Sequence, residues 1–144
     1  MPKPDIYYDH VRQALIKDGW TITHHSYTLR IGKKRLFADL GAARLISAER
    51  GFQKIAVEIK SFVSPSDVYD LEQMLGQYVL YRRLIARREP DRMLYVAVTQ
   101  NTFEAVFQTE LGEVLLVDEE VHLFVFDENK KEILQWLPPI ITAI

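Results

Sequence analysis

Residues 54–62 read KIAVEIKSF, a segment in which apolar residues flank two opposite charges, Glu58 and Lys60. Aliphatic side chains recur there at every second position, which is the period of a β-strand. They are Ile55, Val57 and Ile59. The other face of this predicted strand carries Glu58 and Lys60, so a carboxylate and an amine are neighbours on one side of it.

A third charged residue, Asp39, lies in an equally apolar segment upstream. The segment Arg35–Gly41 alternates in the same way, and it is predicted to form a strand in which Asp39 meets Glu58 when the two strands pair. Desolvating a charge is costly unless the charge is paired or bound to a metal. The convergence of Asp39, Glu58 and Lys60 therefore predicts a divalent cation at this place in the sheet.

The expected ligands of that cation are oxygen atoms. The carboxylates of Asp39 and Glu58, together with the backbone carbonyl of Ile59, form a hard site suited to Mg²⁺ or Mn²⁺. Lys60 beside them can orient or deprotonate an attacking water. The alternative interpretation is an ordinary surface ion pair between Glu58 and Lys60. The apolar residues around both charges favour the metal site.

This order of residues resembles the PD-(D/E)xK nuclease superfamily. Asp39 is followed by Glu58-x-Lys60 at a strand end, although Ala38 stands where the motif has proline. The resemblance implies an α/β fold with a restriction-endonuclease-like core, a mixed central β-sheet flanked by helices. It also implies that Asp39, Glu58 and the Ile59 carbonyl bind the metal and that Lys60 activates water.

Gln77 and Tyr81 extend the resemblance to the RecB-like branch, because they match its Gln-x-x-x-Tyr motif on the following predicted helix. Residues four apart share one face of a helix, and we expect this face to lie near Glu58. The resemblance implies that the pair steadies the site or the scissile strand. The alternative for Tyr81 is plain core packing.

Beyond these motifs, nearly the whole chain resembles the XisH family of factors that control excision of the fdxN element in cyanobacteria. The similar segments are Asp5–Tyr7, Ala14–Thr23, Asp39–Ala42, Ile55–Phe62, Asp70–Gln73, Leu75–Tyr78 and Gln135–Trp136. The resemblance implies DNA, an XisI-like companion protein and a site-specific recombinase as partners. It leaves two functions open: a Mg²⁺-dependent endonuclease-like protein acting with the companion, or a catalytically inactive regulatory or DNA-binding subunit.

Length and composition predict one domain over residues 1–144, with a core of its own. The chain has no cysteine, which excludes disulfides, thiolate metal sites and a cysteine nucleophile. We find no signal sequence or apolar segment of membrane-spanning length, and we expect a cytoplasmic protein. The net charge of −2 predicts that any contact with DNA is local or supplied by a partner.

The first predicted helix begins at Asp5 as N-cap and ends at Asp18-Gly19. Asp9 and His10 lie in it. In RecB-like nucleases an acidic residue or histidine of the first helix can approach the metal, so the resemblance makes both residues accessory candidates. A solvated helix face is the alternative.

A β-meander is predicted next, from Trp20–His25 through Tyr27–Ile31 into the Asp39 strand. His24 and His25 are adjacent and so point to opposite faces of a strand, which argues against a shared zinc ion. The turn at residues 33–35 is basic and is either a phosphate contact or a solvated hairpin tip.

Residues 41–51 are predicted as a short helical or irregular segment. It contains Glu49, a candidate third acid of the site, for which pairing with Arg50 or Lys54 is the alternative. A long helix is then predicted from Ser64 as N-cap to about Arg88. The arginines in its C-terminal half either hold a DNA backbone or complement the helix dipole. They are Arg82, Arg83, Arg87 and Arg88.

The remaining chain is predicted to alternate between strands and a helix, as in an α/β fold. The apolar segments 93–99 and 122–127 are expected to be buried strands, with a helix at 101–107 after the first of them. The apolar end, Trp136–Ile144, is expected to dock on the core, on a second protomer in a homo-oligomer, or on a partner.

Overall fold

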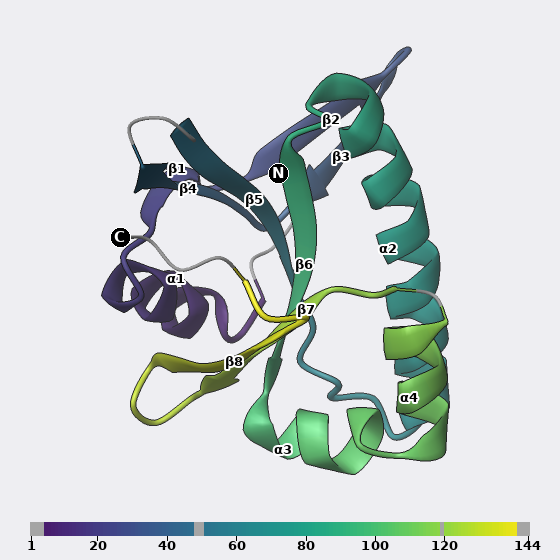
Figure 1. The fold of residues 1–144 in the computed structure, drawn as a ribbon. Coiled ribbons are helices and arrows are strands. Elements are labelled where there is room, and N and C mark those ends of the chain that lie inside the picture. The colour runs from purple at the N-terminus through teal and green to yellow at the C-terminus, as the bar shows by residue number, and fades with distance from the viewer. Residues whose placement is uncertain (1–4, 48–50, 119, 141–144) are drawn as a thin grey trace.

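The computed structural model describes residues 5–47, 51–118 and 120–140 of the chain. A six-stranded sheet has the order β1-β4-β5-β6-β7-β8, and β2 and β3 form a separate hairpin. Its β5–β6 and β6–β7 pairs are parallel and its other pairs are antiparallel. The prediction of an α/β protein with a mixed central sheet flanked by helices is thus confirmed (Figure 1).

The helices are α1 (Tyr8–Lys17), α2 (Asp67–Arg88), α3 (Gln100–Thr102) and α4 (Glu110–Val117), and a π-helical turn, Phe103–Phe107, follows α3. The strands are β1 (Thr21–His24), β2 (Tyr27–Ile31), β3 (Lys34–Ala38), β4 (Leu40–Ser47), β5 (Gly51–Ile59), β6 (Arg92–Thr99), β7 (Leu123–Asp127) and β8 (Glu132–Leu137). None of the helices in the described part combines the length and the apolar character needed to cross a bilayer.

The sheet separates two apolar clusters. Helix α1 packs on one face, where Val11 and Leu15 meet Ile55 and Val57 of β5. Helices α2 and α4 cover the other face, where Met74 belongs to the same cluster as core residues of β6 and β7 (Figure 1). Because the second half of β5, Ile55–Ile59, and most of β6 lie inside this sandwich, their side chains are buried on both faces. β5, α2 and β6 follow one another along the chain and form a β–α–β unit, in which the two strands are parallel.

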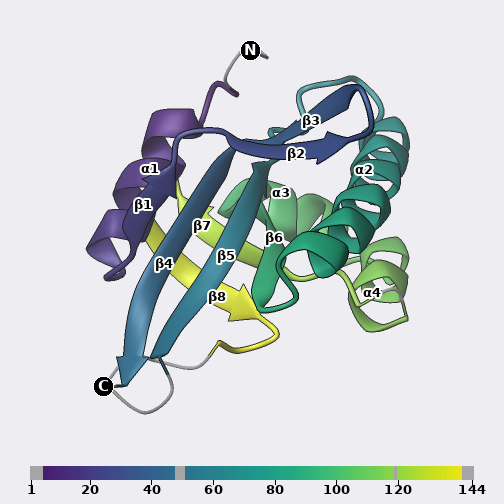
Figure 2. The ribbon, with the colours of Figure 1, turned by 90° about the horizontal axis from the view of Figure 1, so that it is seen from above.

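The predicted single strand Arg35–Gly41 is wrong, because the chain changes partner at Asp39. Residues before it pair with β2, and residues after it pair with β1 and β5. The continuous meander is wrong for the same reason, since β1 pairs with β4 rather than with β2. Asp39 thus lies at the junction of the hairpin and the main sheet, as Figure 2 lets the reader follow from β3 into β4.

The helical or irregular segment predicted for residues 41–51 is also wrong over residues 41–47. These residues continue β4, which pairs along β5 from Leu40 opposite Val57 to Ser47 opposite Gly51. The pairing is nonlocal, so it overrides weak local preferences. Glu49 lies outside the described residues.

The predicted helix starts require small corrections. The N-cap of α1 is Tyr7 rather than Asp5, although the Asp5 carboxylate accepts a hydrogen bond from the Tyr7 backbone N–H. The N-cap of α2 is Ser66 rather than Ser64, since the Ser66 hydroxyl accepts from the N–H of Tyr69 at 3.1 Å. Gly19 after α1 has a φ of +95°, which favours glycine, as predicted for the helix end.

The C-terminal part follows the expected alternation, with one strand that the sequence analysis missed. Residues 101–107 are helical but divide into α3 and the π-helical turn. Trp136 belongs to β8, which pairs with β7, rather than to an irregular tail. Ile140 packs against the cluster under α1, so the described part of the tail docks on the chain's own core.

Candidate active site

The register of β4 and β5 brings Asp39 beside Glu58. Leu40 of β4 is paired with Val57 of β5, and the two strands are antiparallel. Asp39, which precedes Leu40, therefore lies opposite Glu58, which follows Val57. The backbone N–H of Ile59 donates to Oδ2 of Asp39 at 2.7 Å, which closes the junction. The N–H and C=O of one strand residue point to the same edge. The Ile59 carbonyl is therefore directed toward the Asp39 side of β5.

Helix α2 adds the Gln77–Tyr81 pair to the same site. Gln77 Nε2 lies 3.4 Å from Oε1 of Glu58 and donates to it. The same nitrogen lies 3.3 Å from the hydroxyl oxygen of Tyr81. Tyr81 is buried and belongs to the core cluster under α2, so it is both a core residue and a contact of Gln77. The structure thus links the helix motif to Glu58 through Gln77.

These residues line one pocket of about 310 Å³ at the carboxyl end of β5. Its lining includes the five predicted side chains, Asp39, Glu58, Lys60, Gln77 and Tyr81. It also includes Ile59 and four residues that sequence reasoning had not assigned to the site, namely Asp5, Arg35, Leu36 and Phe37. The two-residue period of a strand could have predicted Arg35 and Phe37, because it places both residues on the same strand face as Asp39.

Burial favours the protonated form of both carboxyl groups, those of Asp39 and Glu58. Glu58 is only 8% exposed, and its pKa rises to about 9, mainly through desolvation and then through the negative charge of Asp39. Desolvation also raises the pKa of Asp39, although the Ile59 N–H favours the charged form. The Lys60 ammonium acts in the opposite direction on the pKa of both carboxyl groups. A further cation beside the two groups would favour the charged form of both.

The residues fit a hard divalent cation. Oε2 of Glu58 is buried and has no hydrogen-bond partner among the described residues. Such an orphan oxygen, beside a second carboxylate with a raised pKa, is the arrangement that a bound cation stabilises. Within the described residues, no three His, Asp or Glu side chains cluster as a metal site. Asp39 and Glu58 would therefore need the Ile59 carbonyl and water to complete the coordination.

The accessory candidates on α1 lie outside this pocket lining. Asp9 is exposed and accepts hydrogen bonds from Arg12, at 2.9 Å, and Gln13. His10 stacks edge-on against Tyr7, with ring centroids 5.4 Å apart. The N-terminal acid that reaches the site is Asp5, whose negative charge raises the pKa of both Asp39 and Glu58.

A larger pocket of about 490 Å³ lies elsewhere, between the end of α4 and the end of β8. Its lining is mainly apolar, with Leu116, Val121, Leu137 and Pro138 beside Glu120 and His122. It brings together fewer charged groups than the pocket around Glu58. The smaller pocket is therefore the better candidate for chemistry.

Comparison with protein families finds one match over most of the chain. The model described as XisH protein matches residues 1–134. A solved structure of an XisH family protein from Nostoc punctiforme is similar with a TM-score of 0.83 and 34% identity, covering 92% of this chain and 99% of that one. A fdxN element excision controlling factor protein from Anabaena variabilis has a TM-score of 0.82 and 36% identity, covering 92% of this chain and 98% of that one.

A curated protein, 12-oxophytodienoate reductase 7 of Oryza sativa subsp. japonica, is 26% identical over 117 residues. The match covers 81% of this chain but only 29% of the reductase. Because this chain spans less than a third of that protein, the activity in its name is not transferred here.

Proposed function

This chain belongs to the XisH family, and on that premise we propose that it is an endonuclease-like protein of the PD-(D/E)xK type that acts on DNA with Mg²⁺ or Mn²⁺. The observation that carries the proposal is the buried pair Asp39 and Glu58. Both carboxyl groups have raised pKa values, and one oxygen of Glu58 lacks a partner. A folded protein retains such a pair at a cost in stability, which a cation site explains.

Five residues of the pocket lining have roles that their positions support. Asp39, Glu58 and the Ile59 carbonyl would hold the cation, which supplies Lewis acidity toward a phosphate oxygen or water. Lys60, on the same pocket wall, donates hydrogen bonds to a water or to a phosphate oxygen and offsets developing negative charge. Gln77 is a positioning residue. It donates a hydrogen bond to Oε1 of Glu58, and Oε2, which has no partner among the described residues, would remain available to the cation.

The biological setting is inferred from the Anabaena variabilis relative, which is described as a fdxN element excision controlling factor. We infer that this chain likewise acts in excision of a DNA element, with an XisI-like companion and a site-specific recombinase. The net charge of −2 gives it little general attraction for DNA, so its own phosphate contacts would be local and the companion would supply others.

A cleavage assay tests the proposal. Wild type and Lys60→Ala are compared on single-stranded, duplex and branched DNA in Mg²⁺ or Mn²⁺, with and without the companion. Lys130→Ala is the matched control, because Lys130 is an exposed lysine outside the pocket lining. We expect cleavage by wild type and Lys130→Ala and its loss in Lys60→Ala. Cleavage that survives Lys60→Ala contradicts the assigned role.

The second candidate function is a regulatory subunit whose carboxylates bind a cation without cleavage. The low net charge favours it, since a nuclease working alone usually carries a basic surface. A stable complex with the companion, together with no cleavage under any condition above, would establish this alternative.

A further inference from the structure

The β2–β3 hairpin carries a concentrated positive charge on a chain that is acidic overall. Residues 30–35 read RIGKKR, so four of six are basic. All four side chains, Arg30, Lys33, Lys34 and Arg35, are exposed. None of the four forms an ion pair with a carboxylate of the described residues. This group is called the basic hairpin tip below.

The pairing of the hairpin sets two like charges opposite each other. Arg30 is the cross-strand partner of Arg35, an arrangement that destabilises a hairpin by itself. Their neighbours Leu29 and Leu36 point the other way, into the cluster under α2. The two guanidinium groups therefore share the outward face, where an anion can relieve their repulsion.

The outward face of the hairpin leads into the candidate active site. Arg35 and Phe37 both line the pocket that holds Glu58 and Lys60. They are two residues apart on β3, so they lie on one face of the strand. Phe37 is half-buried and offers an aromatic surface between the basic hairpin tip and the carboxylates. Exposed cations together with an aromatic ring are the elements of a binding surface for a nucleic-acid strand.

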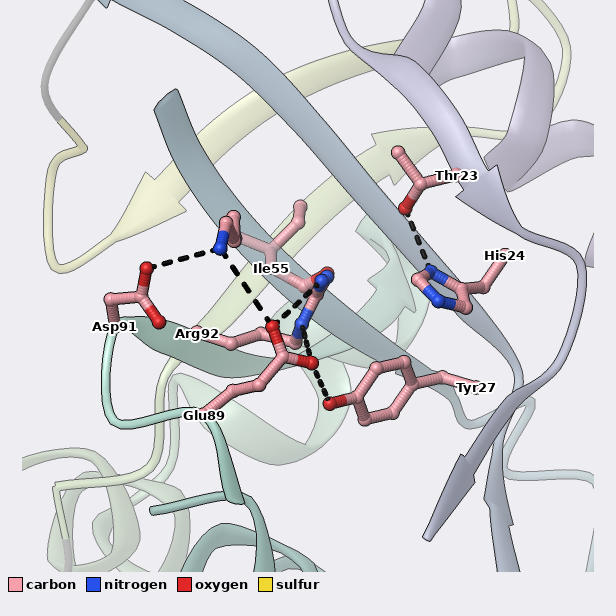
Figure 3. A network of polar contacts seen from close by, with 8 residues as sticks. Thr23, His24, Tyr27, Ile55, Glu89, Asp91 and Arg92 are labelled. Carbon is pink, nitrogen blue, oxygen red and sulfur yellow. Dashed lines mark hydrogen bonds and ion pairs between the residues drawn. The ribbon is translucent and has the colours of Figure 1, made fainter. Parts of the chain in front are cut away.

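Buried and half-buried contacts hold this hairpin in place. At its base, the Tyr27 hydroxyl donates to Glu89, which also accepts from Arg92 at 3.2 Å (Figure 3). Arg92 in turn donates to the carbonyl of Ile55 in β5 at 2.8 Å. Toward the tip, Arg88 at the end of α2 donates to the carbonyl of Arg30. Figure 2 shows the hairpin reaching from the sheet toward α2.

We propose that the outward face of the β2–β3 hairpin binds the phosphate backbone of a DNA strand and leads that strand into the pocket of Glu58. Arg30 and Arg35 contact phosphates on this face, and the exposed lysines of the turn, Lys33 and Lys34, contact phosphates at its tip. Phe37 packs against the nucleotide beside the phosphate that faces Lys60. This inference rests on the proposed function, because it identifies the surface by which the same site takes its substrate.

Binding is measured with the 144-residue chain carrying Lys60→Ala, so that the assigned cleavage chemistry does not interfere. Fluorescently labelled single-stranded and duplex DNA are titrated in Mg²⁺ at several salt concentrations. The test variants add Lys33→Ala with Lys34→Ala, Arg35→Ala, or Phe37→Leu. The matched control adds Lys17→Ala with Lys130→Ala, which removes the same charge from exposed positions outside the pocket.

We expect the double-lysine variant to lose about tenfold in affinity at low salt and to lower the salt slope by about 1.4 to 1.8, while the control changes both much less. Phe37→Leu should weaken the binding of single-stranded DNA by about fivefold. The salt slope should stay unchanged, because stacking on an aromatic ring involves no charge. Equal losses in the test and control variants would overturn the inference, as would unchanged binding in the three test variants or no measurable binding at all.

Failure here is separable from failure of the proposed function. A Mg²⁺-induced rise in melting temperature that is retained by the hairpin variants shows that they fold and keep the cation site. Hairpin-dependent binding without cleavage by wild type supports this inference and refutes the nuclease. Cleavage with hairpin-independent binding does the reverse.

Discussion

The backbone N–H of Ile59 donates to Oδ2 of Asp39 at 2.7 Å, joining the end of β5 to the residue at which the hairpin meets the main sheet. The contact places a carboxylate where two sheets diverge and where the last residues of β5 leave the ladder. Stability and cation binding are therefore coupled at this point, because both depend on the ionisation of Asp39 and its neighbour Glu58.

In the presence of a chelator, the stability of the protein should fall as the pH rises between about 4.5 and 9. The pKa of Glu58 is raised from 4.5 to about 9, so above pH 4.5 the unfolded state releases a proton that the folded state keeps. The stabilisation that the raised pKa of Glu58 provides is fully present below the pKa of this group in the unfolded chain. It is lost as the pH rises, at a slope of at most about 1.4 kcal/mol per pH unit.

Urea unfolding of wild type and Glu58→Gln from pH 5 to pH 9 checks this expectation. The neutral amide does not titrate, so the difference in unfolding free energy between the two proteins should grow in favour of the variant as the pH rises. A constant difference across this range would show that the Glu58 pKa is near its ordinary value.

Mg²⁺ or Mn²⁺ should raise the melting temperature, because the cation binds the folded carboxylates and not the unfolded chain. At 100 times the dissociation constant the stabilisation is about 2.7 kcal/mol. Asp39→Asn and Glu58→Gln should each remove the increment, since an amide lacks the charge that holds a hard cation. Asp9→Asn is the control, because Asp9 is exposed and pairs with Arg12. A full increment in either site variant would place the ion elsewhere.

Gln77→Ala should weaken cation binding by about tenfold, because Glu58 loses the donor on Oε1 and the freed carboxylate turns more easily. Tyr81→Phe should have a smaller effect, since the hydroxyl contacts Gln77 rather than Glu58. Titration calorimetry with Mg²⁺ measures both. Gln73→Ala, an exposed position one turn earlier on α2, provides the baseline. Equal affinities for Gln77→Ala and Gln73→Ala would remove Gln77 from the site.

Tyr27→Phe should destabilise the protein by about 1 to 2 kcal/mol and loosen the hairpin, because a half-buried hydrogen bond to Glu89 is lost. Desolvation, and in second place the hydrogen bond to the Glu89 carboxylate, raise the pKa of Tyr27 to about 12. Hydrogen exchange of the β2 and β3 amides, compared with Tyr69→Phe at an exposed tyrosine, reports the loosening. Protection equal to that of the control would show that the base of the hairpin is held by its apolar contacts alone.

Several parts of the site could be predicted from the sequence, because they depend on neighbours along the chain. The two-residue period places Glu58 of β5 and Lys60, which directly follows β5, on the same side of the chain, and the four-residue spacing places Gln77 and Tyr81 on one face of α2. Both patterns are local properties of a strand and a helix. The segment pairing that brings Asp39 to Glu58 was expected as well, although within a strand of the wrong extent.

The tertiary structure alone decided the rest, because it depends on contacts between residues far apart in the chain. Pairing with β5 makes residues 41–47 a strand, and the change of partner at Asp39 turns the hairpin toward α2. Packing brings Asp5 and Phe37 into the pocket. The raised pKa of Glu58 arises only in the folded protein, since its main cause, desolvation, is a property of the folded surroundings and not of the residue itself.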